Sequence, residues 1–480
     1  MNTNMRNLTM MTDLYQLTMM YGYYKHGMAK NEAVFDLFFR STREHSAYAV
    51  MAGTESVVDY INNLHFSQED IAYLRSLNLF DEEFLSVLAS LRFTGEIYGM
   101  EEGTVVFPYE PLIRVKAPIM EAQLIETAML NLVNHQTLIA TKASRVCYAA
   151  QGDNVLEFGL RRAQGPDAGI LGARAAIIGG CSSTSNVMTG QLFNVGIAGT
   201  HAHSWVMSFP TELDAFRAYA KVFPDSCMLL VDTYDTLRSG VPNAIKVFDE
   251  LKAKGHRPVG IRLDSGDLAY LSKKARKMLD DAGYKDARIF ASSDLDELVI
   301  RDLKAQGAKI DVWGVGTRLI TSVDCPALGG VYKLAAEIVD GEVIPKIKLS
   351  ENTVKMTNPG IKKVLRFYDK DNMAIADLIA LDEEEFDGSK PLTLYHPEQT
   401  YKTMTICDFK VRELLVPLFK DGKQVYTPPT VAESAEYAKR DLATIWEESK
   451  RLMNPHIYKV DISDKLYDLK QKLIRESKRV

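Results

Sequence analysis

The chain has 480 residues, of which 46% are hydrophobic and 25% charged, and it carries a formal net charge of −6 at pH 7. This composition is typical of a globular protein with about two or three domains, and the dispersed negative charge gives no electrostatic basis for binding nucleic acid or an anionic membrane. Five scattered cysteines without a CxxC pair argue against a disulfide framework and a zinc knuckle. No segment approaches the roughly 20 apolar residues of a membrane span. We therefore expect a soluble, cytoplasmic protein.

Residues 1–145 are expected to form a small N-terminal α/β domain. The segment 12–27 has apolar and aromatic residues at helical spacing, and 33–40 alternates as a strand does. The region 93–117 contains the glycine and proline turns of a small β-rich module. The segment 124–145 predicts a long amphipathic helix that leads into the next domain.

Residues 146–350 are expected to form an irregular, incomplete α/β barrel. Apolar runs recur through this region and end in polar residues; they cover 154–162, 175–185, 194–204, 228–235, 258–267, 287–294 and 310–317. The last four begin at intervals of about 30, 30 and 23 residues, the length of one strand-plus-helix unit. An open doubly wound sheet has the same alternation, but about seven units without a long linker favour a barrel.

Residues 351–480 are expected to form a third, appended domain. This region is more charged than the barrel and ends in a helical pattern over 465–480. It contributes little to the chemistry that the central region indicates.

Polar side chains follow the predicted strands of the barrel. In parallel α/β barrels the catalytic groups lie at the carboxyl ends of the strands. Here these ends carry arginines, carboxylates, hydroxyls and glycine turns, namely Arg161, Ser182, Thr200, His203, Asp232, Arg262, Asp264, Ser293, Asp294, Gly316 and Thr317. One face of the barrel is therefore expected to gather a polar site.

Two of these strand ends carry arginines suited to anion recognition. Arg161 lies three residues after Phe158, where it could bind phosphate or carboxylate in bidentate fashion or form a surface ion pair beside a core ring. Arg262 and Asp264 share one face of a predicted strand, and a buried pair of this kind is costly unless it binds something. The glycine-rich segment 313–319 either cradles phosphate on its backbone amides or is a tight turn, and it contains no P-loop.

The segment GTHAHSWV (199–206) places His201 and His203 two residues apart. Metal ligation, base catalysis, nucleophilic attack and a core position all fit this segment. Neither an HExxH nor a GxSxG pattern accompanies it, which disfavours a zinc protease site and a nucleophile elbow. A histidine held by a carboxylate can attack phosphorus, because the partner stabilises the cation that forms.

In combination, several motifs resemble the nicotinate phosphoribosyltransferase family. They are TDLYQLTM (12–19), EFGLRRAQGPD (157–167), GTHAHSW (199–205), VDTYDT (231–236), RLDSGDL (262–268), GVGT (314–317) and VYKL (331–334). The resemblance implies a type II phosphoribosyltransferase fold, usually dimeric. It also implies that nicotinate and phosphoribosyl pyrophosphate are converted to nicotinate mononucleotide and pyrophosphate in NAD salvage. ATP and Mg²⁺ are implied, with ATP hydrolysis coupled through a phosphohistidine.

The resemblance implies a role for individual residues. The family pattern G-T-x-A-H-S puts His203 at the phosphorylated position and His201 at the variable one. Phe158 then stacks on the pyridine, and Tyr15 of a partner subunit completes that site. The remaining implied contacts are with phosphate, ribose or the pyridine: Arg161, Asp232, Arg262, Asp264, Ser293, Asp294, Gly316, Thr317 and Thr357. The resemblance assigns no Mg²⁺ ligand.

Substrate choice is expected to depend on the segment GGCSST. Nicotinamide-using relatives carry an acidic residue at the corresponding place, whereas Ser182 and Ser183 are neutral and can donate to a carboxylate. This difference predicts a preference for nicotinate. The alternatives are a nicotinamide or quinolinate phosphoribosyltransferase, or a barrel that binds phosphoribosyl groups without chemistry.

Overall fold

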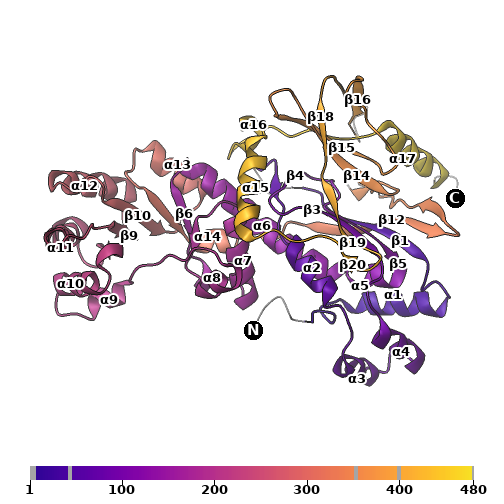
Figure 1. Ribbon diagram of the computed structural model, residues 1–480, viewed down its shortest axis with the longest axis horizontal. Coiled ribbons are helices and arrows are strands. Elements are labelled where there is room, and N and C mark those ends of the chain that lie inside the picture. The colour runs from indigo at the N-terminus through magenta and orange to yellow at the C-terminus, as the bar shows by residue number, and fades with distance from the viewer. Residues whose placement is uncertain (1–6, 42–45, 351–354, 397–401, 478–480) are drawn as a thin grey trace. The chain divides into compact units, whose positions relative to one another are not determined.

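The computed structural model describes residues 7–41, 46–350, 355–396 and 402–477 (Figure 1). It confirms the expected mixed α/β fold. The chain divides into two compact units: unit 1 comprises residues 1–141 and 327–480, and unit 2 comprises residues 142–326. Among the described residues, no helix combines the length and the apolarity needed to cross a bilayer.

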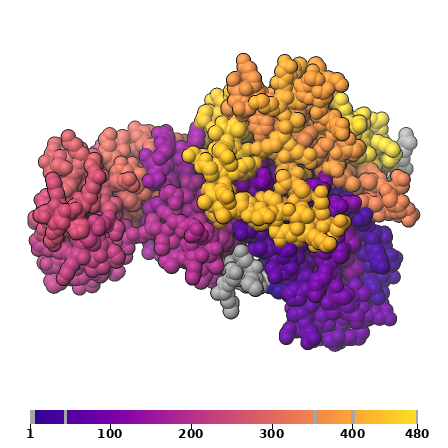
Figure 2. Space-filling view, viewed as in Figure 1, coloured from indigo at the N-terminus to yellow at the C-terminus, as the bar shows by residue number. Residues whose placement is uncertain are grey.

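Unit 1 contains a seven-stranded antiparallel sheet built from both ends of the chain. Its order is β13 (Glu342–Pro345), β12 (Gly330–Val339), β1 (Glu32–Phe39), β5 (Ile113–Pro118), β3 (Glu96–Met100), β19 (Leu415–Lys420) and β20 (Lys423–Gln424). Strand β1 pairs with β12, and β3 pairs with β19, so strands that precede unit 2 are bonded to strands that follow it. Figure 2 shows the orange and yellow C-terminal segments packed against the indigo N-terminal ones. The two-unit division therefore differs from the expected three domains, because main-chain pairing joins the terminal segments.

A second sheet in unit 1 comes entirely from the C-terminal segment. Its order is β17 (Thr403–Ile406), β16 (Leu392–Tyr395), β21 (Val460–Ile462), β15 (Ala374–Leu381), β14 (Lys362–Tyr368) and β18 (Lys410–Glu413). Two short strands, β2 (Ala49–Val50) and β4 (Val105–Val106), pair separately.

The helices of unit 1 include the three long ones that the sequence predicted. These are α1 (Leu14–Lys25), α6 (Glu126–Ala150), which runs on into unit 2, and α17 (Asp464–Ser477). The last three residues of the predicted 465–480 helix lie outside the described residues. The other helices are α2 (Thr54–Asn62), α3 (Gln68–Ser76), α4 (Glu82–Ser90), α5 (Ile119–Leu124), α15 (Val431–Ala443) and α16 (Glu447–Lys450).

Unit 2 is built on a six-stranded parallel sheet. Its order is β7 (Ser183–Thr184), β6 (Asn154–Glu157), β11 (Val312–Val315), β10 (Arg288–Ser293), β9 (Gly260–Leu263) and β8 (Met228–Leu230). Strands β8, β9, β10 and β11 are neighbours in the sheet in the same order as in the sequence, and β11 pairs with β6. This is the cyclic strand order of a barrel. Within residues 142–326 no ladder joins β7 to β8. The incomplete barrel therefore stays a prediction, whereas the parallel sheet is confirmed.

Helices connect these strands, and several of them start close to the strand ends that carry the expected site residues. Helices α11 (Val241–Ala253), α12 (Leu268–Asp281) and α13 (Glu297–Ala305) link β8 to β11. The others are α7 (Pro166–Ile178), α8 (Val187–Phe193), α9 (His203–Met207), α10 (Glu212–Val222) and α14 (Thr317–Ile320).

The prediction of a strand over 194–204 is wrong. Only Ile197 forms an isolated bridge, to Thr184, and His203 is the first residue of helix α9. Asn194 has a left-handed backbone conformation, and Gly196 and Gly199 interrupt the apolar residues, so the segment cannot pair as a continuous strand.

Candidate active site

A polar cluster lies at the carboxyl ends of β8, β9 and β10 in unit 2, and Arg262 is at its centre. The guanidinium donates from Nε to Ser292 Oγ at 2.7 Å, from Nη1 to Thr200 Oγ1 at 3.1 Å and from Nη2 to Asp264 Oδ1 at 2.9 Å. Strand β9 positions this side chain, because Arg262 pairs with Leu230 of β8 and Phe290 of β10. The Arg262 guanidinium therefore joins three segments: β10, the residues just before α9, and the residues just after β9.

Asp264 is the carboxylate that Arg262 and Ser292 hold in place. The Ser292 hydroxyl donates to Asp264 Oδ1, and Asp264 Oδ2 lies 3.6 Å from His203 Nε2. Burial raises the pKa of the Asp264 carboxyl, but the hydrogen bond from Ser292 and the positive charge of Arg262 outweigh burial and hold that pKa below its usual value. Asp264 is therefore ionised at neutral pH and faces the imidazole as an anion.

Asp232 is a second carboxylate of the cluster, just after β8. Its Oδ2 accepts the backbone N–H of Asp264 at 2.8 Å and the Ser265 hydroxyl at 2.7 Å. Its Oδ1 is buried and has no hydrogen-bond partner among the described residues. This oxygen can accept a bond from a ligand.

The two histidines have different surroundings. His203 Nδ1 lies 3.1 Å from Thr233 Oγ1, its Nε2 faces Asp264, and 39% of its side chain is exposed. His201 is buried, its Nε2 accepts the N–H of Leu230 at 3.2 Å, and its ring centroid lies 4.7 Å from that of Tyr219. Burial lowers the pKa of His201 to about 4, so this ring is neutral at pH 7. Only His203 faces the cluster.

Phe158 borders the cluster as an aromatic wall. Its N–H donates to Val315 O at 2.8 Å, and the Arg262 guanidinium carbon lies 5.8 Å from the ring centroid. A Cβ on Gly314 would lie 2.8 Å from the ring, so the glycine makes room for this ring position. A planar ligand can stack on such a ring.

Most of the other expected site residues of unit 2 follow their strands at the same edge of the sheet, whereas Ser182 precedes β7 and bonds Val155 of β6. Arg161 is exposed in the short helix η2 (Leu160–Arg162) after β6, and Ser182 is exposed just before β7. Ser293 and Asp294 are exposed at the end of β10, and Gly316 and Thr317 begin α14 after β11.

Two expected residues belong to unit 1. Tyr15 lies on α1, and 46% of it is exposed. Thr357 is buried, and its Oγ1 accepts the N–H of Lys348 at 3.0 Å. The cluster in unit 2 therefore contains neither residue.

Sequence reasoning missed several hydroxyl partners of the cluster. Ser292 bonds both Arg262 and Asp264, Thr233 faces His203, and Ser265 bonds Asp232. The only available signal was their position beside predicted residues, and serine and threonine are common at strand ends for other reasons.

Comparisons with known proteins give a consistent result. Sequence models described as the N-terminal and C-terminal domains of nicotinate phosphoribosyltransferase match residues 10–134 and 361–470. The chain is 48% identical over 473 residues to the nicotinate phosphoribosyltransferase of Bacillus subtilis, which covers 98% of this chain and 96% of the relative.

Two solved structures are also similar. The crystal structure of human nicotinic acid phosphoribosyltransferase matches with a TM-score of 0.86 and 32% identity, covering 96% of this chain and 99% of that chain. Nicotinate-nucleotide pyrophosphorylase from Pyrococcus furiosus matches with a TM-score of 0.70 and 22% identity, covering 91% and 95% of the two chains, which shows likeness of fold alone.

Proposed function

The chain belongs to the nicotinate phosphoribosyltransferase family, and from this premise we propose its reaction in detail. Nicotinate attacks C1 of phosphoribosyl pyrophosphate, the bond from C1 to the pyrophosphate oxygen breaks, and nicotinate mononucleotide and pyrophosphate form. ATP hydrolysis is coupled to this transfer through phosphorylation of His203. The product enters NAD biosynthesis.

The contact between His203 and Asp264 supports the phosphohistidine. An Nε2 proton directed at the ionised Asp264 leaves Nδ1 as the attacking nitrogen, once the Thr233 hydroxyl that lies 3.1 Å from it is displaced. Nδ1 forms a bond to the γ-phosphorus of ATP, the bond from that phosphorus to the bridging oxygen breaks, and ADP leaves with the electron pair. Asp264 then stabilises the positive charge that the phosphorylated ring gains.

The same cluster suits glycosyl transfer. Loss of pyrophosphate builds positive charge at the ribose ring, which the carboxylates of Asp232 and Asp264 stabilise, while Arg262 and Arg161 compensate the charge of the phosphates. The ring of Phe158 stacks on the pyridine and orients its nitrogen.

The residues also fit Mg²⁺. The unpartnered, buried Asp232 Oδ1 is a hard oxygen donor beside a second carboxylate, which is the ligand chemistry that Mg²⁺ prefers. No group of three or more acidic, histidine or cysteine side chains forms a metal site in the part of the chain that the structure describes. Water and substrate phosphates would therefore supply the remaining ligands, and the bound ion would stabilise the leaving pyrophosphate.

Phosphorylation is tested by the two histidine variants. With nicotinate, phosphoribosyl pyrophosphate, Mg²⁺ and γ-labelled ATP, His203→Ala should abolish acid-labile labelling and the stimulation of nicotinate mononucleotide formation by ATP. His201→Ala is the matched control and should retain both. Labelling that persists in the His203 variant would exclude this residue.

Nicotinate is the proposed base because Ser182 and Ser183 are neutral and do not repel its carboxylate; the Ser182 hydroxyl donates to the Val155 carbonyl at 3.2 Å and would turn from it to meet the base. The amide N–H groups of nicotinamide would find no acceptor at these serines. We therefore expect nicotinate to be preferred by on the order of 3 kcal/mol, or about a hundredfold in kcat/KM. Ser182→Asp should narrow this gap by weakening nicotinate use. Equal kcat/KM for the two bases in the unmodified enzyme would favour the nicotinamide alternative. Quinolinate turnover with CO₂ release would favour the other enzyme alternative, and binding of phosphoribosyl pyrophosphate without turnover would favour a non-catalytic barrel.

A homodimer completes the proposal. A side chain that enters the site of a partner subunit must be exposed on its own subunit, and Tyr15 is exposed on α1.

A further inference from the structure

Glu157 of unit 2 is a buried carboxylate that, unlike Asp232 and Asp264, takes no part in the polar cluster. It is the last residue of β6, directly before Phe158, and it is fully buried. Its Oε1 accepts the backbone N–H of Gly159, and its Oε2 accepts the Thr184 hydroxyl at 2.6 Å. A buried carboxylate is costly, so both donors are needed to keep it in place.

The Gly159 donor fixes the turn that follows β6. This turn lies between Phe158 and helix η2, which carries Arg161. A Cβ at Gly159 would collide with Ile320 and lie 2.7 Å from Glu157 Oε1, so the main chain approaches both side chains as closely as glycine allows. The position of Gly159 therefore sets the direction in which Phe158 and Arg161 leave the sheet.

The Thr184 donor fixes two further segments. Thr184 Oγ1 accepts the N–H of Asn186 at 3.0 Å, which directs its own proton to Glu157. Thr184 ends β7, two residues after Ser182. Its main chain bonds Gly196 and Ala198, in the segment that leads to the cluster. The Thr184 hydroxyl thus adds a side-chain link to the main-chain bonds that already join this turn to β6, from Ser182 N–H to the Val155 carbonyl at 2.8 Å and from Ser185 N–H to the Glu157 carbonyl at 2.9 Å.

We propose that Glu157 and Thr184 form a positioning pair, which holds the turn 158–161 and the serine turn 182–183 at the separation that nicotinate requires. The inference rests on the proposed function, since it takes Phe158 and Ser182 as contacts of the base. Neither member of the pair touches the substrate. Burial raises the pKa of the Glu157 carboxyl above its usual value, and the hydrogen bonds from Thr184 and Gly159 oppose this rise.

The test compares variants that keep shape and change one hydroxyl. Thr184→Val removes the hydroxyl at constant volume, and Thr184→Ser restores it. We expect Thr184→Val to raise the KM for nicotinate about tenfold, with kcat and the KM for phosphoribosyl pyrophosphate changed less than about twofold. Thr184→Ser should return the KM for nicotinate to near its original value.

Thr189→Val is the matched control. Thr189 is equally buried and lies on α8, and its Oγ1 donates to the Ile170 carbonyl at 3.3 Å, a hydrogen bond that the variant loses. It should lower the thermal midpoint without raising the KM for nicotinate. An unchanged nicotinate KM in Thr184→Val, or an equal rise in Thr189→Val, overturns the positioning pair.

A second variant covers a folding failure of Thr184→Val. Glu157→Gln leaves one acceptor for two donors and should raise the same KM selectively; an unchanged nicotinate KM in this variant overturns the pair as well. Failure of the proposed function has a separate signature, because the unmodified protein would then form no nicotinate mononucleotide.

Discussion

At the scale of single residues, the surroundings of a histidine decide its chemistry. His201 lies against Tyr219 and accepts a main-chain N–H, so its ring is a structural acceptor. His203 has an ionised carboxylate on one side and a hydroxyl on the other, with part of its surface open. The second arrangement, unlike the first, combines an exposed ring with a carboxylate that can stabilise the positive charge gained when the ring attacks a reactant.

The burial of His201 has a consequence for stability at acid pH. The unfolded chain protonates this residue near pH 6.5, whereas the folded protein keeps it neutral down to about pH 4. The unfolded state binds more protons within this window, so the free energy of unfolding falls as the pH falls. The contribution of His201 to that loss is about 2 kcal/mol between pH 7 and pH 5.

Urea unfolding at pH 7 and pH 5 measures this contribution. His201→Gln keeps an acceptor for the Leu230 N–H but does not titrate. The variant should therefore lose about 2 kcal/mol less than the unmodified protein on acidification. Equal losses in the two proteins would contradict the assignment.

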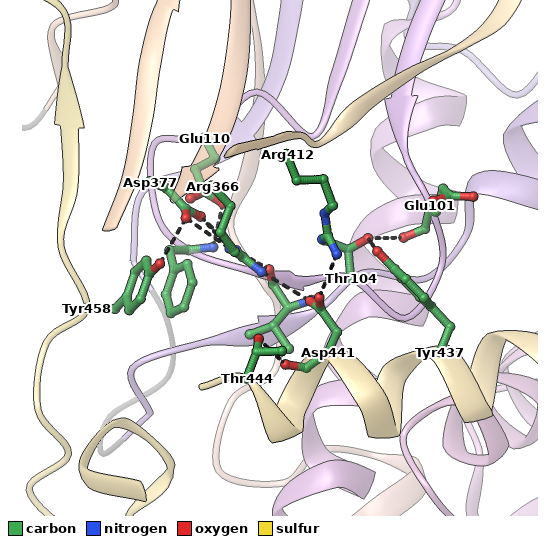
Figure 3. Close-up of polar contacts among 12 residues, drawn as sticks. Glu101, Thr104, Glu110, Arg366, Asp377, Arg412, Tyr437, Asp441, Thr444 and Tyr458 are labelled. Atoms are coloured by element: carbon green, nitrogen blue, oxygen red, sulfur yellow. Dashed lines mark hydrogen bonds and ion pairs between the residues drawn. The ribbon is translucent and has the colours of Figure 1, made fainter. Parts of the chain in front are cut away.

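At the scale of elements, a buried ion-pair network joins strands of the second sheet of unit 1 to β4 and α15 (Figure 3). Arg366 of β14 donates to Asp377 of β15 at 2.7 Å, to Asp441 of α15 at 3.1 Å and to the Val105 carbonyl of β4 at 2.7 Å. The Tyr458 hydroxyl donates to Asp377 at 2.9 Å. One guanidinium thus compensates two fully buried carboxylates from two elements.

Removing this guanidinium should be costly. Arg366→Leu leaves Asp377 and Asp441 without their main buried cation, and we expect a loss of about 4 kcal/mol in the free energy of unfolding. Arg75→Leu is the control, because Arg75 forms an exposed pair with Glu82 on the surface of the same unit. Thermal unfolding of both variants checks this. Similar midpoints for the two would show that the network contributes no more than a surface pair.

Elements could be predicted where one local pattern determines them. The runs beginning at 228, 258, 287 and 310 all contain strands, because a buried parallel strand needs a continuous apolar segment. The run 175–185 was misleading, since residues up to Ile178 end helix α7 and only Ser183–Thr184 form a strand. A short apolar run does not distinguish a buried helix from a strand.

Partners that come from distant segments could not be predicted. Ser292 and Thr233 join the cluster through side-chain geometry that spacing does not specify. The pairing of β1 with β12 likewise joins segments on either side of unit 2. Such contacts depend on the whole topology and leave no local pattern.

At the scale of the whole molecule, the chain leaves unit 1 after residue 141 and returns to it at residue 327. Every member of the polar cluster therefore lies in one continuous segment, while Tyr15 and Thr357 belong to the other unit. The proposed site, which combines this cluster with Tyr15, therefore takes residues from a unit 1 as well as from a unit 2. Subunit mixing can establish whether they come from one chain or from two.

Mixing two impaired variants tests a shared site directly. Tyr15→Ala lacks the side chain proposed to complete the pyridine site of the partner subunit, and His203→Ala lacks the proposed nucleophile. In a mixed dimer with shared sites, one site combines the intact His203 of one subunit with the intact Tyr15 of its partner. Random exchange makes about half of the dimers mixed, so activity at limiting nicotinate should recover to about a quarter of the unmodified level. A mixture of His203→Ala with Asp264→Asn should recover nothing, because both changes affect the same cluster. If co-purification of differently tagged subunits demonstrates exchange and the first mixture still stays inactive, Tyr15 acts within its own chain or not at all.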